Sequence, residues 1–178
     1  GVPVSSPMVM PHADEVADVR VVRMADQPVV SRRIGTYDTP TPRTHLLSNG
    51  SYAVMLTNAG SGYSCWKDTF VSRWRPDVTR DHWGQWLYIS NPATAELWSA
   101  TYQPTLAKPD QYEVIFSIDK AEYHRRDGDI ESQLEIAIST EDAVEVRHLR
   151  LTNTGVSSVT LDIASYLEVV LTKAAADQ

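Results

Sequence analysis

The stretch from residue 129 to residue 153, "DIESQLEIAISTEDAVEVRHLRLTN", contains two long runs in which apolar and polar side chains alternate. Because successive side chains of a strand point to opposite faces, this period of two predicts strands over 129–139 and 144–153, joined by a polar turn. In the second run the alternation slips near His148, where we expect a β-bulge. Two long neighbouring strands of this kind indicate an antiparallel sheet.

Strand-like sequence patterns continue on both sides of this stretch. Residues 85–90 ("QWLYIS"), 112–118 ("YEVIFSI") and 159–171 ("VTLDIASYLEVVL") also favour strands, and no helical period is evident before the last residues. Runs of nine to eleven residues exceed the usual strand length of about five to six. The sequence therefore predicts an all-β fold, a large antiparallel two-sheet sandwich.

Proline content divides the chain. Residues 1–43 carry six of the ten prolines, and "TYDTPTPRT" is a segment that neither a helix nor a central strand would tolerate. We interpret 1–43 as an extended leader or linker with an edge strand near 17–24, and 44–173 as the β-sandwich domain. No internal repeat is visible.

Charge and cysteine content exclude several classes of function. A formal net charge of −7 argues against nucleic-acid binding and against a polybasic membrane patch. No run of about 18 apolar residues predicts a membrane span. The single cysteine, Cys65, excludes an intramolecular disulfide framework, and beside aromatic residues it is interpreted as a packing residue.

The glycines in "NAGSGYSCW" raise the question of a phosphate cradle. Such a cradle needs a helix directly after the glycines, so that its N-terminal N–H groups meet the anion. Tyr63 and the residues after it are poor helix starters, and no Lys-Ser/Thr pair follows. The glycines instead favour a turn between two strands, where a positive φ is tolerated.

Aromatic residues and an Arg–Asp group gather between residues 63 and 102. All five tryptophans lie there, and an indole or phenol can stack on a sugar ring while its polar group forms hydrogen bonds. The alternative is that most of them fill the core; Trp83 and Trp86, three apart, cannot share a strand face. The arginines and aspartates of residues 71–86 favour an ion pair that pins a loop, with sugar or phosphate binding as the alternative.

Catalytic and metal-ligating groups are not evident. Glycoside cleavage generally needs two carboxylates, or one carboxylate and a phosphate. Asp68, Asp77 and Asp81 are the candidates in the aromatic region, and none stands out as a buried acid. His82 beside Asp81 has no second ligand pair at a suitable spacing, so no metal site is predicted.

Several consecutive blocks carry a family resemblance. "HLLSNGSYAVMLTNAGSGYSCW", "SRWRPDVTRDHWGQWLYI", "WSATYQP", "YEVIFSIDKAEYHRRDGDIE", "EVRHLRLTN" and "SYLEVVL" follow one another without large gaps. From about residue 41 to 173 they resemble the N-terminal β-domain of the glycoside hydrolase family 94 phosphorylases, formerly glycosyltransferase family 36. The module near the C-terminus of cyclic β-1,2-glucan synthases is the most similar. The departures are Cys65 and the pair Ser90-Asn91, where the family often carries Arg-Asp.

The resemblance implies a super-sandwich of the galactose-mutarotase-like type that precedes an (α/α)₆ catalytic barrel. The barrel would supply the general acid, and inorganic phosphate would be needed only by the full enzyme, so the isolated chain is expected to be inactive and to need no cofactor. Residues 174–178 would begin the connection to the barrel. The implied partners are a β-glucan oligosaccharide through the parent enzyme, the chain's own barrel and a second copy of the chain, with no nucleic acid. The implied location is a cytoplasmic-facing soluble domain of a bacterial inner-membrane protein.

The resemblance also implies a role for the loop and the Arg–Asp segment. They would line a glucan-binding rim of an enzyme that controls glucan chain length, and no residue of this chain would be catalytic. Two other functions stay open, a free-standing carbohydrate-binding module and a purely structural or dimerisation domain. The predicted substrate-binding residues are Gly60, Ser61, Gly62, Tyr63, Ser64, Trp66, Arg73, Trp74, Arg75 and Asp77.

Overall fold

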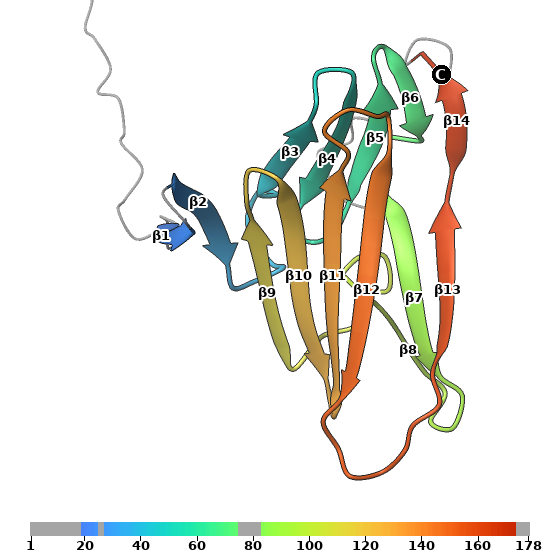
Figure 1. The fold of residues 1–178 in the computed structure, drawn as a ribbon. Coiled ribbons are helices and arrows are strands. Elements are labelled where there is room, and N and C mark those ends of the chain that lie inside the picture. The colour runs from blue at the N-terminus through green and yellow to red at the C-terminus, as the bar shows by residue number, and fades with distance from the viewer. Residues whose placement is uncertain (1–18, 25–26, 75–82, 174–178) are drawn as a thin grey trace, which may run out of the picture.

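The computed structural model describes residues 19–24, 27–74 and 83–173. This part of the chain forms fourteen strands and no helix, which confirms the predicted all-β class. Every pair of neighbouring strands is antiparallel. Two layers pack face to face, with one large sheet in front of two smaller ones in Figure 1. Within the described residues there is no helix long and apolar enough to cross a membrane.

The first layer is a six-stranded sheet in the order β1-β2-β9-β10-β11-β12. Its strands are β1 (Val19–Met24), β2 (Gln27–Ile34), β9 (Gln111–Phe116), β10 (Lys120–Asp127), β11 (Ile130–Ile138) and β12 (Glu145–Asn153). The predicted leader, residues 1–43, contains β1 and β2. Because β2 pairs with β9 over residues 32–34, this segment contributes directly to the large sheet.

The second layer consists of a five-stranded sheet, β14-β6-β5-β4-β3, and a three-stranded sheet, β13-β7-β8. The strands of the five-stranded sheet are β3 (Thr44–Ser48), β4 (Tyr52–Thr57), β5 (Gly62–Trp66), β6 (Thr69–Ser72) and β14 (Val169–Thr172). Those of the three-stranded sheet are β7 (Gln85–Asn91), β8 (Glu96–Ser99) and β13 (Asp162–Leu167). Only Glu168 separates β13 from β14, which lie end to end in Figure 1, so the run predicted as one strand joins both sheets.

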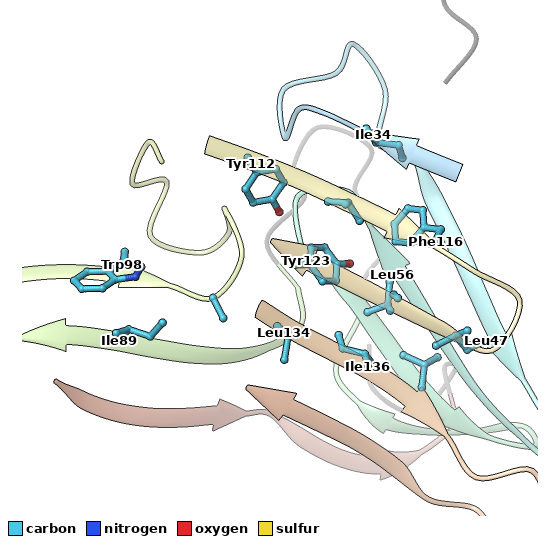
Figure 2. Close-up of a cluster of buried hydrophobic side chains, with 14 of the residues drawn as sticks. Ile34, Leu47, Leu56, Ile89, Trp98, Tyr112, Phe116, Tyr123, Leu134 and Ile136 are labelled. Atoms are coloured by element: carbon cyan, nitrogen blue, oxygen red, sulfur yellow. The ribbon is translucent and has the colours of Figure 1, made fainter. Parts of the chain in front are cut away.

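The core lies between the layers and follows from the alternation of the strands. Tyr123 and Ile136 of the large sheet are at most 1% exposed, and they meet Leu47 and Leu56 of the second layer in one apolar cluster (Figure 2). Burying a large apolar side chain contributes roughly 1.5–3 kcal/mol, so this shared cluster holds the layers together.

The prediction of a β-bulge near His148 is wrong. Residues 130–138 of β11 pair with residues 145–153 of β12 without a register shift. The inward-facing residues of β12 are half-buried from Glu145 to Leu151, but they change from charged at Arg147 to apolar at Leu149. In the sequence, this change of residue type within one face looks like a break in the apolar–polar alternation. The backbone of the strand is nevertheless regular.

Candidate functional site

The turn between β4 and β5 holds the glycines that the sequence singles out. The N–H of Gly60 donates to the carbonyl of Thr57 at 3.0 Å, and that of Ser61 donates to Thr57 Oγ1 at 3.1 Å. The N–H of Gly62 donates to the carbonyl of Trp83 at 2.7 Å. All three N–H groups are therefore engaged within the protein, as a turn requires and a phosphate cradle would not allow.

Close packing explains why glycine occupies these positions. Gly60 has a φ of +97°, and a Cβ atom there would overlap the side chain of Thr101. A Cβ atom on Gly62 would overlap the backbone carbonyl of Met55 on the paired strand. The absence of a side chain allows the hairpin to pack at both points.

A buried arginine supports this turn from the large sheet. The side chain of Arg125 is fully buried and forms a bidentate ion pair with Asp127 at 2.7 Å. Its guanidinium also donates to the carbonyl of Thr101 at 2.8 Å. The neighbouring Gln103 donates its N–H to the carbonyl of Ala59 at 2.9 Å. The turn is therefore fastened to the connection between β8 and β9.

Five polar residues form a cluster on the buried face of the hairpin. We call it the Glu145 cluster, and it consists of Glu145, Arg147, Ser64, Tyr52 and Gln85. The Glu145 side chain is 7% exposed and accepts hydrogen bonds from Ser64 Oγ at 2.5 Å and from Tyr52 OH at 3.2 Å. Arg147 Nε donates to its other carboxylate oxygen at 2.5 Å. Gln85 Nε2 donates to Ser64 Oγ at 3.0 Å. The cluster links the two layers at their β12 side.

Electrostatics agree with a structural role for this cluster. Burial, and next the negative charge of Glu145, raise the pKa of Tyr52 above its usual value, so the phenol stays protonated and remains a donor. The Glu145 carboxylate already has Ser64, Tyr52 and Arg147 as partners. Such a carboxylate fastens the two layers together and is poorly placed to transfer a proton to a substrate.

Four of the predicted substrate-binding residues are buried: Gly60, Ser61, Gly62 and Ser64. Ser64 is 0% exposed and its hydroxyl belongs to the Glu145 cluster. In the described chain these four positions therefore shape the hairpin and present no side chain to solvent.

The opposite face of the hairpin carries aromatic rings. Tyr63 of β5 lies 5.2 Å from Phe70 of β6 and 5.0 Å from Trp74, measured between ring centroids. We call these three half-buried side chains the aromatic face. Next to it, on β3 and β4, Leu46 is 59% exposed and pairs with Met55, so the surface continues as apolar. Burial raises the pKa of Tyr63, with a smaller contribution from Cys65.

Trp66 does not belong to the aromatic face. It lies three residues after Tyr63 on β5, and this odd spacing directs the two side chains to opposite faces. Trp66 is 44% exposed at the strand end, and the Nζ of Lys67 lies 4.7 Å from its ring. The structure thus separates the two aromatic residues that the sequence places in one rim.

Arg73 forms an ion pair, the first of the two sequence interpretations. Its guanidinium donates to Glu168 at 3.1 Å, and its N–H donates to the Glu168 carbonyl at 2.9 Å. Both side chains are about one third exposed, at 35% and 37%, so the pair itself contributes little stability. It fastens β6 to the junction of β13 and β14. Arg75 and Asp77, also predicted to bind substrate, lie outside the described residues.

The remaining reactive candidates have ordinary surroundings. Asp68 is exposed, and the hydrogen bond from Lys173 lowers its pKa, the opposite of what a general acid needs. Burial raises the pKa of the Cys65 thiol, which disfavours the nucleophilic thiolate. Asp81 and His82 lie outside the described residues.

The sequence analysis did not include Glu145 and Phe70 among the site residues. Glu145 accepts the hydrogen bonds of the buried cluster, and Phe70 is part of the aromatic face. Phe70 lies four residues before Trp74, so the even spacing on a strand could have placed the two rings on one face. Glu145 carries no comparable signal, because its partner Ser64 is 81 residues away. For Trp83 and Trp86 the prediction is confirmed: Trp86 is 4% exposed, whereas Trp83 is half-buried before β7.

Comparison with known proteins identifies similar sequences. The family model described as "Glycosyl hydrolase 94, supersandwich domain" matches residues 27–178. The chain is 36% identical over 156 residues to the cyclic beta-(1,2)-glucan synthase NdvB of Rhizobium meliloti (strain 1021), a match that covers 88% of this chain and 5% of that protein.

Phosphorylases are also similar. The N,N'-diacetylchitobiose phosphorylase of Vibrio furnissii is 23% identical over 145 residues, covering 79% of this chain and 18% of that protein. The 3-O-beta-D-glucopyranosyl-beta-D-glucuronide phosphorylase of Paenibacillus borealis is 28% identical over 133 residues, covering 71% and 16%. The chain therefore spans between 5% and 18% of the length of these three relatives.

Proposed function

The chain belongs to the supersandwich domain family of glycosyl hydrolase 94, and on that premise we propose that it is a non-catalytic, carbohydrate-associated domain of a β-1,2-glucan phosphorylase-like module. In this proposal it supports and lines the active site of an (α/α)₆ barrel in the same parent enzyme. The parent would use inorganic phosphate to trim glucan chains and so control their length before cyclisation.

The engagement of its buried polar groups supports a non-catalytic role. The Glu145 carboxylate is held by three donors, and Asp68 is exposed and paired with Lys173. Inverting cleavage needs an acid with a raised pKa and an acceptor on the opposite side of the sugar. Asp68 and Glu135 instead have lowered pKa values, because Lys173 and Lys120 donate hydrogen bonds to their carboxylates.

The single observation that carries the carbohydrate proposal is the aromatic face. The rings of Phe70 and Trp74 lie 5.2 Å and 5.0 Å from that of Tyr63 on the outer side of the five-stranded sheet, where all three side chains are half-exposed. Rings that combine apolar faces with polar groups suit stacking on a pyranose while its hydroxyls are hydrogen-bonded. Arg73 would extend this rim. Trp66 projects from the opposite face of β5, so in this proposal it would contact only a longer glucan that passes around the strand end.

The names of the relatives supply the substrate class and the setting. A glucan synthase and two saccharide phosphorylases share this domain as a small part of much longer chains. The proposed partners are accordingly a β-glucan oligosaccharide, the parent's own catalytic barrel and a second copy of the parent. The proposed location is the cytoplasmic side of a bacterial inner membrane.

Substitution within the parent enzyme tests the proposal. We expect Tyr63→Ala and Trp74→Ala to raise KM for long β-1,2-glucans about fivefold, because each removes a stacking contribution of roughly 1 kcal/mol, and to leave KM for the shortest substrate nearly unchanged. Trp66→Ala would show whether the rim extends to the strand end. Leu97→Ala removes an apolar side chain that is 55% exposed on β8 and serves as the control.

Unchanged kinetics in both Tyr63→Ala and Trp74→Ala would reject the glucan-binding rim. A separate titration of the isolated chain with β-1,2-glucooligosaccharides, followed by tryptophan fluorescence, distinguishes the main alternative. A saturable change that Trp74→Ala abolishes would favour a free-standing carbohydrate-binding module, whereas no change favours a domain that acts only beside its barrel.

A further inference from the structure

The outer face of the large sheet contains a hollow that the proposed function does not use. It has a volume of about 420 Å³ and lies over β9, β10, β11 and β12, on the side turned away from the second layer. This volume falls within the range of about 300–1,000 Å³ that is usual for small-molecule sites. The hairpin with the aromatic face belongs to the other layer, so the two surfaces are separate.

Strand pairing builds the first row of side chains in this hollow. Glu113 on β9 pairs with His124 on β10, which pairs with Gln133 on β11, which in turn pairs with Arg150 on β12. Directly paired residues point to the same face of a sheet. The row therefore presents four polar side chains side by side across four strands, a width of about 14 Å at roughly 4.8 Å per strand spacing.

A second row lies beside the first. Gln111 pairs with Arg126, Arg126 pairs with Glu131, and Glu131 pairs with Thr152. Residues between these positions, such as Ser132, are buried and point to the opposite face. The alternation thus collects eight hydrogen-bonding side chains in two parallel rows on one surface.

Several of these groups retain hydrogen-bonding capacity. Arg150 is exposed, and within the described part of the chain its side chain forms no hydrogen bond or ion pair; its charge acts at longer range on Glu135. His124 lines the hollow, and its Nε2 is shielded from solvent and has no partner among the described residues. An unsatisfied polar atom in a shielded position is uncommon and costs free energy until it finds a partner. A ligand hydroxyl that reaches this nitrogen would supply one.

Charge balance indicates the chemical class of the ligand. Within the two rows, the two arginines, Arg126 and Arg150, balance the two glutamates, Glu113 and Glu131, so the formal charge of the rows sums to zero. The third arginine of the lining, Arg125, is turned into the core and is paired with Asp127. Donors and acceptors alternate across the hollow, as the hydroxyl groups of a neutral polyol require. The ring of Tyr112 is turned into the core, where its hydroxyl donates to the Asn58 carbonyl, so stacking contributes little here.

We propose that this hollow is a second, hydrogen-bonding site for a neutral oligosaccharide, separate from the aromatic face. A chain laid across the two rows would bind through Gln133, Arg150 and Glu131 with no aromatic ring beneath it. Such a site would hold a glucan on the outside of the sandwich whether or not the aromatic face contacts substrate.

Nuclear magnetic resonance on the whole 178-residue chain tests this inference. The ¹⁵N-labelled protein is titrated with neutral β-1,2-linked glucotetraose, and we expect saturable amide shifts confined to β9–β12. The double variant Gln133→Ala/Arg150→Ala should bind about tenfold more weakly, since it removes two hydrogen-bonding partners. His148→Ala, which changes an exposed residue of β12 outside the hollow, should bind like the unchanged chain. Far-ultraviolet circular dichroism checks the fold of each variant.

Three outcomes would overturn the proposal: no saturable shift at the highest soluble sugar concentration, shifts confined to β4–β6, or a double variant that is folded and binds undiminished. A tetraose carrying one glucuronate unit is the second probe, and its preferred binding would overturn the assignment to a neutral ligand. Shifts over β4–β6 report on the aromatic face. Failure here is therefore distinguishable from failure of the proposed function.

Discussion

At the scale of single residues, His45 illustrates how burial sets the protonation of a side chain. Its ring stacks on Phe116 with centroids 4.8 Å apart, and its Nε2 lies 2.7 Å from the Ser117 carbonyl oxygen, so this nitrogen carries the proton. Arg32 lies 3.4 Å from the other ring nitrogen. Burial, the largest effect, lowers the pKa of His45 from its usual 6.5; the Ser117 hydrogen bond opposes this, and the charge of Arg32 lowers it further.

A lowered pKa makes the stability of the sandwich depend on pH in a defined direction. On acidification the unfolded chain binds a proton at His45 before the folded chain does, so this contribution to stability is complete above about pH 6.5 and is lost as the pH falls toward the lower folded value. We expect His45→Gln to show a smaller loss of stability between pH 7.5 and pH 5 than the unchanged chain, as measured by urea unfolding.

An exposed position without a titrating side chain provides the control for this measurement. Thr152→Gln should leave the pH dependence as it is in the unchanged chain. An identical pH dependence in His45→Gln and the unchanged chain would contradict the assignment of this titration to His45.

At the scale of the element, the β4–β5 hairpin depends on two close contacts. Gly60 packs against Thr101, and Gly62 packs against the backbone of Met55 within the same hairpin. Side-chain flexibility can relieve the first contact in part, whereas the second involves a carbonyl group in a strand. The backbone contact makes Gly62 the more demanding position.

We expect Gly62→Ala to lower the free energy of unfolding by about 2 kcal/mol or more, because the added methyl group forces the paired strands apart. Gly35→Ala is the matched control, since nothing lies within 4 Å of a Cβ atom at that position. The control should leave stability unchanged or raise it by a few tenths of a kcal/mol. Chemical denaturation measures both, and equal stability of the two variants would refute the close-contact explanation.

At the scale of the whole molecule, one side of the second layer remains apolar and open. The strands β13 and β14 run along this side in Figure 1, and every residue of β13 is exposed. The exposed large apolar side chains of these two strands, each at least 38% exposed, are Ile163, Tyr166, Leu167, Val169 and Leu171. An apolar edge of this length is a candidate surface for pairing with another chain or another domain.

This edge predicts self-association of the chain in solution. We expect sedimentation velocity to show a concentration-dependent dimer, and Ile163→Lys/Leu171→Lys to shift the chain to a monomer, because charges on an edge strand oppose pairing. Ser158→Lys/Thr160→Lys carries the same change of charge at exposed positions near the edge and should associate like the unchanged chain. A monomer at every concentration, or an equal effect of both variants, would contradict this prediction.

Local pattern made a large part of the fold predictable. The runs at 112–118, 129–139 and 144–153 correspond to β9, β11 and β12, and the glycine turn lies between two strands as predicted. The division of 159–171 at Glu168 was not predictable, because both halves have the same alternation. What divides them is the pairing of β13 with β7 and of β14 with β6.

The candidate site was predictable only for residues whose type and spacing within one short segment point to it. Tyr63 and Trp74 were singled out by residue type, and the structure brings them together with Phe70. The burial of Ser64 was not predictable, since its hydroxyl donates to Glu145, a residue 81 positions away.

The order of the amino acids alone predicts the period of the long strands, the position of the tight turn and the resemblance to the family. These follow from the order of residues within a short segment, because neighbouring side chains on a strand must face opposite ways. The layer that each strand joins, the polar groups that are buried and the rings that meet become apparent only in the folded molecule. Those outcomes depend on contacts such as Ser64 with Glu145 and Arg73 with Glu168, 81 and 95 residues apart, whose formation no local pattern encodes.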